Sequence, residues 1–182
     1  MVVRSPESGR SHKSLERPLS NSISRRFARA MLPKEVFLSH SDKDRRFATA
    51  LAEEMRRHGV PVWYSRIHIV GAQQWHDEIG AALGRCDWFV LMLSPDAVKS
   101  AWVKNELLFA LNRQRLSKRI VPLLYKTCKY ERLSWTLPSF QIIDFRKSIE
   151  DGYRGLLRVW GMKYEGPGRE KTPTKRKSRS TK

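Results

Sequence analysis

The sequence predicts an α/β protein: a five-stranded parallel sheet with helices on both faces and disordered basic tails. Short apolar runs indicate strands, and segments with the 3.6-residue periodicity of amphipathic helices separate most of them. Strands that alternate with helices favour a parallel sheet whose carboxyl ends share one edge, because the crossovers are right-handed. Five strands fit the flavodoxin-like order 2-1-3-4-5. The expected strands are residues 35–39, 60–65, 88–93, 120–125 and 140–145.

The first strand is expected to lead into a helix. Residues 40–44 supply Ser and Asp as helix caps, and Gly59 is a natural stop. The second strand tolerates Pro61 near its start, above all at a sheet edge. The apolar face of the helix between these two strands consists of Phe47, Leu51 and Met55.

Two further helices flank the third strand. A loop over residues 66–74 is expected before the first of them, whose apolar face begins with Trp75 and continues with Ile79 and Leu83. After the strand, Pro95 suits a first helical turn. The candidate helix caps there are Ser94, Asp96 and Ser100.

The last third of the chain contains two more strands and a closing helix. Residues 126–138, between the strands, show no clear element. An amphipathic helix over residues 148–160 ends the domain, and Gly161 could stop it. Its apolar positions are Ile149, Tyr153, Leu156, Leu157 and Trp160.

Trp102 and Glu106 follow the third strand and are four residues apart, so they share one face of a helix. Val103, Leu107, Ala110 and Leu111 form a separate stripe that can face the core. An indole and a carboxylate would therefore meet at the sheet edge where α/β proteins bind ligands. The pair alone favours a plainer interpretation, a core tryptophan beside a solvated glutamate.

The charge of the chain is concentrated at its ends. Residues 1–32 and residues 164–182 each carry seven Lys/Arg against two Glu, or +5 each, which leaves +8 of the total +18 for residues 33–163. We therefore expect one domain over residues 33–163 between disordered tails. Basic tails attract nucleic acid non-specifically, or they serve only solubility. Met31 is an alternative translation start, and the Arg-rich segment before it faintly resembles a transit peptide.

Composition also narrows the class of protein. No apolar run approaches the roughly 20 residues of a membrane helix, so we expect no membrane association. Cys86 and Cys128 are far apart, which fits a reduced, cytoplasmic protein without a disulfide framework. The five histidines lack the spacing of metal ligands, so no metal site is predicted.

Several motifs of nucleotide chemistry and hydrolysis are absent from the sequence. No GxGxxG follows the first strand, and neither GxxxxGK[ST] nor GxSxG occurs. A phospho-receiver would need acids at the ends of the first and third strands, where this chain has serines. These absences disfavour a Rossmann site, a P-loop, an α/β-hydrolase and a receiver domain.

Four segments, in this order along the chain, resemble the Toll/interleukin-1 receptor (TIR) domain family, in its bacterial type. The resemblance spans residues 33–162, and it is specific because all four pieces occur in order. The segments are Val36–Ser41, Val62–Ser65, Ile69–Trp75 and Leu93–Leu107.

The resemblance implies an enzyme that cleaves NAD at its nicotinamide–ribose bond, with NAD as substrate and no bound cofactor. Glu106 matches the catalytic glutamate of the family, and Trp102 an aromatic residue of the same pocket. Nucleotide contacts are implied for residues that follow the first two strands, Ser39, His40, Ser41 and Ser65. Many family members have an acid where this chain has Ser65. The family's BB loop, which gates the pocket and mediates assembly, is implied to contain Ile69, Gly71 and Trp75.

Three interpretations of function follow. The first is an NAD glycohydrolase or cyclase that acts in bacterial anti-phage signalling and is switched on by self-assembly, other TIR domains or a partner protein. The second is a non-catalytic TIR adaptor. The third is a nucleic-acid-associated protein, which is disfavoured because the charged segments lack the interleaved aromatic residues used for stacking. Trp75 and Trp63 are expected to pack in the core, as is Trp88.

Overall fold

A single parallel sheet organises the fold, in the computed structural model that describes residues 32–64 and 72–166, with side chains from 77 onward in the second range. Its strand order is β2-β1-β3-β4-β5, so the predicted flavodoxin-like order and the α/β class are confirmed. Most of the predicted tails and most of the predicted loop lie outside the described residues, but Tyr164, predicted in the C-terminal tail, packs against the core. The strands are β1 (Val36–Ser39), β2 (Val62–Trp63), β3 (Trp88–Leu93), β4 (Ile120–Leu124) and β5 (Ile143–Asp144).

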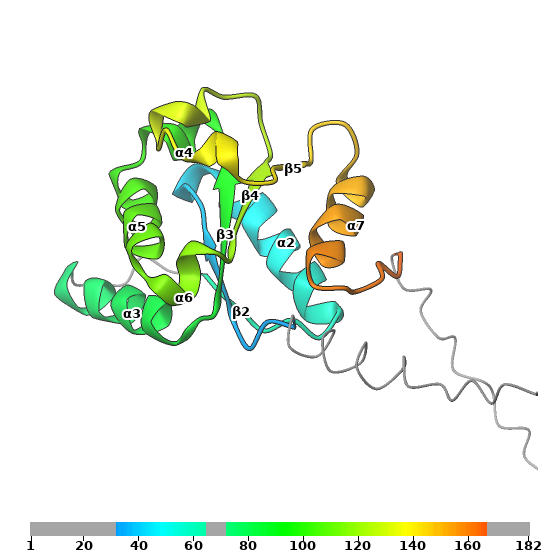
Figure 1. Ribbon diagram of the computed structural model, residues 1–182, viewed down its shortest axis with the longest axis horizontal. Helices are drawn as coiled ribbons and strands as arrows, with labels where there is room; N and C mark the ends of the chain where they lie inside the picture. The colour runs from blue at the N-terminus through cyan, green and yellow to red at the C-terminus, as the bar shows by residue number, and fades with distance from the viewer. Residues whose placement is uncertain (1–31, 65–71, 167–182) are drawn as a thin grey trace, which may run out of the picture. The chain divides into compact units, whose positions relative to one another are not determined.

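Helices cover both faces of the sheet, as predicted (Figure 1). The helices α2 (Arg45–Arg57) and α7 (Ile149–Val159) pack on one face. The other face carries α3 (Ala72–Arg85), α5 (Ala101–Asn112) and the short α6 (Gln114–Ser117). Successive residues of a strand point to opposite faces, so the fully buried β3 supplies both cores.

Successive side chains of β3 alternate between the two apolar clusters on the two faces of the sheet. Val90 and Met92 join α2 and α7 in one apolar cluster. Leu91 and Leu93 join α3 and α5 in the other. Because β3 pairs with β1 on one side and with β4 on the other, it is the central strand of the sheet.

Two serines divide the predicted helix after β3 into two helices. The Ser94 hydroxyl accepts a hydrogen bond from Ala97 N–H at 3.0 Å and caps α4 (Pro95–Lys99). The extended residue Ser100 (φ −80°, ψ 116°) ends α4, and its hydroxyl accepts from Val103 N–H at 3.3 Å, which starts α5. Both predicted serine caps are therefore confirmed, and the break between them sets the direction of α5.

Glycines end the first and last helices of the domain. Gly59 has φ +79° and Gly161 has φ +68°, conformations that a residue with a Cβ seldom adopts. Both predicted stops are confirmed. They turn the chain toward β2 and toward the C-terminal segment.

Several elements differ from the prediction in length or type. The predicted edge strands are shorter than expected: two residues of β2 pair with β1, and two residues of β5 pair with β4. The helix α3 begins at Ala72, three residues before Trp75. Residues 126–138 contain one whole short 3-10 helix and part of another: η2 (Tyr130–Arg132) and η3 (Leu137–Ser139).

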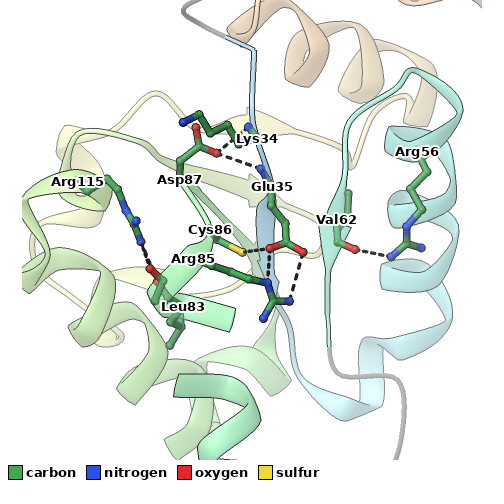
Figure 2. A network of polar contacts seen from close by, with 10 residues as sticks. Lys34, Glu35, Arg56, Val62, Leu83, Arg85, Cys86, Asp87 and Arg115 are labelled. Atoms are coloured by element: carbon green, nitrogen blue, oxygen red, sulfur yellow. Dashed lines mark hydrogen bonds and ion pairs between the residues drawn. The ribbon is translucent and has the colours of Figure 1, made fainter. Parts of the chain in front are cut away.

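A polar network ties together the segments that enter β1 and β3, at the edge where the strands begin (Figure 2). Asp87 Oδ1 accepts from the N–H groups of Lys34 and Glu35 at 2.9 and 3.2 Å. The Glu35 carboxylate accepts from Arg85 Nε at 2.6 Å and from Cys86 Sγ at 3.5 Å. Burial and the neighbouring Glu35 raise the pKa of the Cys86 thiol to about 12. This thiol is a structural donor, with little nucleophilic character.

Among the helices of residues 32–64 and 72–166, none has the length and apolar character needed to cross a bilayer.

Candidate active site

A pocket of about 340 Å³ opens at the opposite edge of the sheet, where β1 ends and α5 begins. The residues that line it come from β1 and the segment after it, from β2, from Ser100 and from α5. They are Phe37, Leu38, His40, Ser41, Asp42, Lys43, Arg45, Trp63, Ser100, Trp102 and Glu106. The position agrees with the general rule that open α/β sheets bind ligands at the carboxyl ends of their strands.

Glu106 is partly buried in this pocket and is held by Ser39. The Ser39 hydroxyl, 1% exposed at the end of β1, donates a hydrogen bond of 2.6 Å to Glu106 Oε2. Burial raises the pKa of Glu106 to about 7, and the bond from Ser39 opposes that rise. The carboxyl group therefore changes charge close to neutral pH.

Trp102 lies one turn before Glu106 and also lines the pocket. Its side chain is 39% exposed, whereas Glu106 is partly buried. The plainer interpretation of this pair, a core tryptophan beside a solvated glutamate, is therefore wrong. Ser39 at the end of β1 contacts the carboxylate, and the indole one turn earlier is more exposed.

The segment after β1 contributes more of the pocket than the sequence predicted. His40 and Ser41 line it, and burial lowers the pKa of His40. The charged residues Asp42, Lys43 and Arg45 line it too, although Asp42 and Lys43 were predicted only within a helix-capping segment and Arg45 was not predicted at the site. Two cations four and six residues after the end of β1 were the signal that could have identified them.

Trp63 combines a core position with a place in the pocket wall. Its ring stacks on Phe37 with centroids 4.9 Å apart, and both residues line the pocket. Trp88 is 5% exposed and lies in the core, as predicted. The pocket thus has an aromatic wall in addition to Trp102.

The remaining predicted site residues fall in the part of the chain that is not described. Ser65, Ile69 and Gly71 are outside the described residues. Trp75 belongs to α3, but its side chain is likewise outside them. The predicted BB loop therefore stays a prediction.

A buried carboxylate fixes the segment that carries His40 and Arg45. Asp44 is 2% exposed and ends η1 (Asp42–Asp44). It accepts hydrogen bonds from Ser94 Oγ and, at 2.8 Å, from Lys126 Nζ. The ends of β3 and β4 are thereby tied to the pocket segment.

In residues 32–64 and 72–166, no group of three or more His, Cys, Asp or Glu side chains is arranged to hold a metal ion.

The family model described as "TIR domain" matches residues 36–157, and the chain belongs to the TIR domain family. The TIR domain of the Toll-related Receptor TRR-2 from Hydra magnipapillata superposes with a TM-score of 0.57 at 19% identity, over 70% of this chain and 98% of that one. A prokaryotic SEFIR domain superposes with a TM-score of 0.54 at 16% identity, over 74% and 98%. At these identities the two structures show the fold.

Two curated bacterial proteins are similar in sequence. The protein named NAD(+) hydrolase PdTIR, from Paracoccus denitrificans, is 32% identical over 70% of this chain and 44% of its own length. The 2' cyclic ADP-D-ribose synthase AbTIR, from Acinetobacter baumannii, is 28% identical over 56% of this chain and 39% of its own. The chain thus spans less than half the length of these relatives.

Proposed function

We propose that this TIR domain cleaves NAD at the bond between nicotinamide and ribose, with Glu106 as the catalytic residue. The observation that carries the proposal is a carboxylate with a raised pKa in a pocket beside Trp102. The names of PdTIR, an NAD(+) hydrolase, and AbTIR, a cyclic ADP-ribose synthase, support the same substrate.

The proposed reaction needs only groups that the pocket and the substrate supply. The C1'–N1 bond breaks, both of its electrons leave with neutral nicotinamide, and the ribose acquires positive charge. The ionised Glu106 stabilises that charge, as a carboxylate does in glycoside cleavage. Water then attacks C1' and loses a proton to Glu106 or solvent to give ADP-ribose, or a hydroxyl of the same molecule attacks C1' and loses its proton in the same way to give a cyclic product.

The rest of the pocket fits the other parts of NAD. Indole faces such as Trp102 can stack on flat rings. Lys43 and Arg45, which pair with Asp96 and Asp42 in this structure, are cations that a diphosphate could recruit. Arg45 Nε is buried and has no hydrogen-bond partner among the described residues, while its Nη2 pairs with Asp42. Together these groups favour a dinucleotide over a simple sugar.

We further propose that cleavage serves signalling in bacterial antiviral defence, in the cytoplasm. This role extends the resemblance to bacterial TIR domains. Self-assembly, another TIR domain or a partner protein would activate the enzyme, so the protein in dilute solution would show no NAD cleavage.

Nicotinamide release from NAD tests the proposal. Concentrated and immobilised wild-type protein is compared with Glu106→Gln, which keeps the size of the side chain and removes its charge. Release by the wild type alone supports the enzyme, and chromatography of the second product separates hydrolysis from cyclisation. Equal release by both variants, or by neither, contradicts the role of Glu106.

A non-catalytic adaptor is the second candidate, and one surface feature favours it. Trp135, between η2 and η3, is 85% exposed, and large exposed aromatic residues are common at protein interfaces. An adaptor would show no turnover by any form of the protein. It would instead lose self-association, measured by light scattering, on Trp135→Ser.

A further inference from the structure

We propose that Ser39 is a positioning residue for Glu106: its hydroxyl holds one carboxylate oxygen and leaves the other for the substrate. The inference rests on the proposed function, because it assigns Glu106 the chemistry. It also changes the role predicted for Ser39, from substrate contact to support of the catalytic group.

The geometry commits the Ser39 hydroxyl to the carboxylate. Ser39 is 1% exposed at the last position of β1, and its Oγ lies 2.6 Å from Glu106 Oε2. The side chain is not among those that line the pocket, whereas Glu106 is. A buried hydroxyl that already donates to a carboxylate has no proton left for a ligand.

The other oxygen of Glu106 is available. Among the described residues no hydrogen bond to Oε1 occurs, and the atom is not among the buried polar atoms that lack a partner. One oxygen is thus fixed to the central part of the sheet, and the other is left accessible. This division fixes the direction in which the carboxylate can approach a sugar.

Charged neighbours of Glu106 do not replace the Ser39 hydroxyl as a cause of the pKa of its carboxyl group. The other titratable groups of the pocket are His40, Asp42, Lys43 and Arg45, all from the segment after β1. The helix α5 itself carries Lys104, and α3, which packs against α5, carries Asp77 and Glu78. The pKa of Glu106 nevertheless follows burial first and then the Ser39 bond, which lowers it. Loss of the hydroxyl should therefore raise the pKa of Glu106 further.

The first test is the pH profile of nicotinamide release by Ser39→Ala, from pH 6 to 9, with enzyme-free blanks. We expect the midpoint to rise by about one pH unit, because a hydrogen bond to a charged group has been lost. Activity relative to wild type should then be about tenfold lower at pH 6 and recover most of that loss at pH 9. A loss of the same size at every pH would show a merely structural role and overturn the inference.

The second test does not depend on turnover. The free energy of unfolding of Glu106→Gln relative to its parent is measured from pH 4 to 9, once in wild type and once in Ser39→Ala. In the wild-type background, the stability gained by Glu106→Gln should increase with pH and level off near pH 7. In the Ser39→Ala background, it should level off about one pH unit higher. Ser41→Ala removes a buried serine that makes no hydrogen bond to Glu106 among the described residues, and it should leave this unfolding profile unchanged.

Together, the two tests distinguish a failure of the proposed positioning role of Ser39 from a failure of the proposed NAD cleavage. If wild type never releases nicotinamide, the proposed function fails, and the unfolding profiles still decide whether Ser39 holds Glu106. If wild type is active and the profiles with and without the hydroxyl coincide, the function stands and the positioning role is wrong.

Discussion

Lys126 Nζ lies 2.8 Å from Asp44 Oδ1, although 82 positions separate the two residues in sequence. The Lys126 side chain is about half exposed and the Asp44 side chain is buried. Ser94 Oγ donates to the second oxygen of Asp44. The Asp44 carboxylate thereby joins the segment after β1, which lines the pocket, to the ends of β3 and β4.

Removal of that carboxylate should destabilise the domain. We expect Asp44→Ala to lower the free energy of unfolding by about 2–3 kcal/mol, because a buried hydroxyl loses its acceptor and Lys126 its partner. Urea denaturation at neutral pH measures the change. Lys43→Ala breaks the exposed pair with Asp96 and serves as control, with a change within about 0.5 kcal/mol. Equal effects of the two substitutions would mean that the buried network contributes little.

Replacement of Glu106 by glutamine should stabilise the protein in a pH-dependent way. The folded state raises the pKa of this acid from 4.5 to about 7, so the ionised form costs stability that is absent below about pH 4.5 and complete above pH 7. At pH 8 Glu106→Gln should be more stable than wild type by about 1–3 kcal/mol, and at pH 4 the two should unfold alike. Thermal unfolding at both pH values checks this. A destabilised glutamine variant at pH 8 would be inconsistent with the raised pKa.

The rate of NAD cleavage should depend on pH through Glu106. Since the ionised carboxylate is the active form, kcat/KM should rise with pH to a plateau, with a midpoint near 7. The midpoint of kcat should be lower, because the cationic nicotinamide of bound NAD favours the ionised form. Initial rates at low and at saturating NAD give the two profiles. A rate that falls as pH rises from 6 to 8 would assign Glu106 the opposite protonation state.

Gly152 of α7 allows the chain to pass close to Phe145. A Cβ at this position would lie 2.4 Å from Phe145 Cδ1, so we expect Gly152→Ala to cost about 1–3 kcal/mol. Gly80→Ala, in α3, meets no atom within 4 Å and should instead stabilise its helix by about 0.5–1 kcal/mol. Chemical denaturation of both variants provides the comparison. Similar behaviour of the two glycines would show that the ring of Phe145 moves aside without cost.

The sequence predicted those parts of the fold that follow local rules. The apolar run that became β3, the serine caps at Ser94 and Ser100, and the stops at Gly59 and Gly161 all depend on neighbouring residues alone. The lengths of β2 and β5 could not be predicted in this way. They depend on how many residues of an edge strand find a partner across the sheet.

The site was harder to predict because its burial arises from long-range contacts. Glu106 is held by Ser39, 67 positions earlier in the chain, so helical periodicity alone indicated a solvated side chain. Lys43 and Arg45 resemble ordinary charged residues at a helix start until the fold turns them toward the pocket. Family resemblance supplied Glu106 and Trp102, but it did not supply the role of Ser39.

The position of β3 between β1 and β4 has a consequence for biosynthesis. A nascent chain can pair β1, β2 and β3 as soon as residue 93 has emerged, but one edge of the all-apolar β3 then stays open until residues 120–124 follow. An unpaired apolar strand edge is a template for intermolecular pairing. Truncated chains that end between residues 94 and 119 should therefore aggregate or bind chaperones during translation, and chains that end between β4 and β5 should do the same through the open edge of β4, whereas chains that include β5 should not.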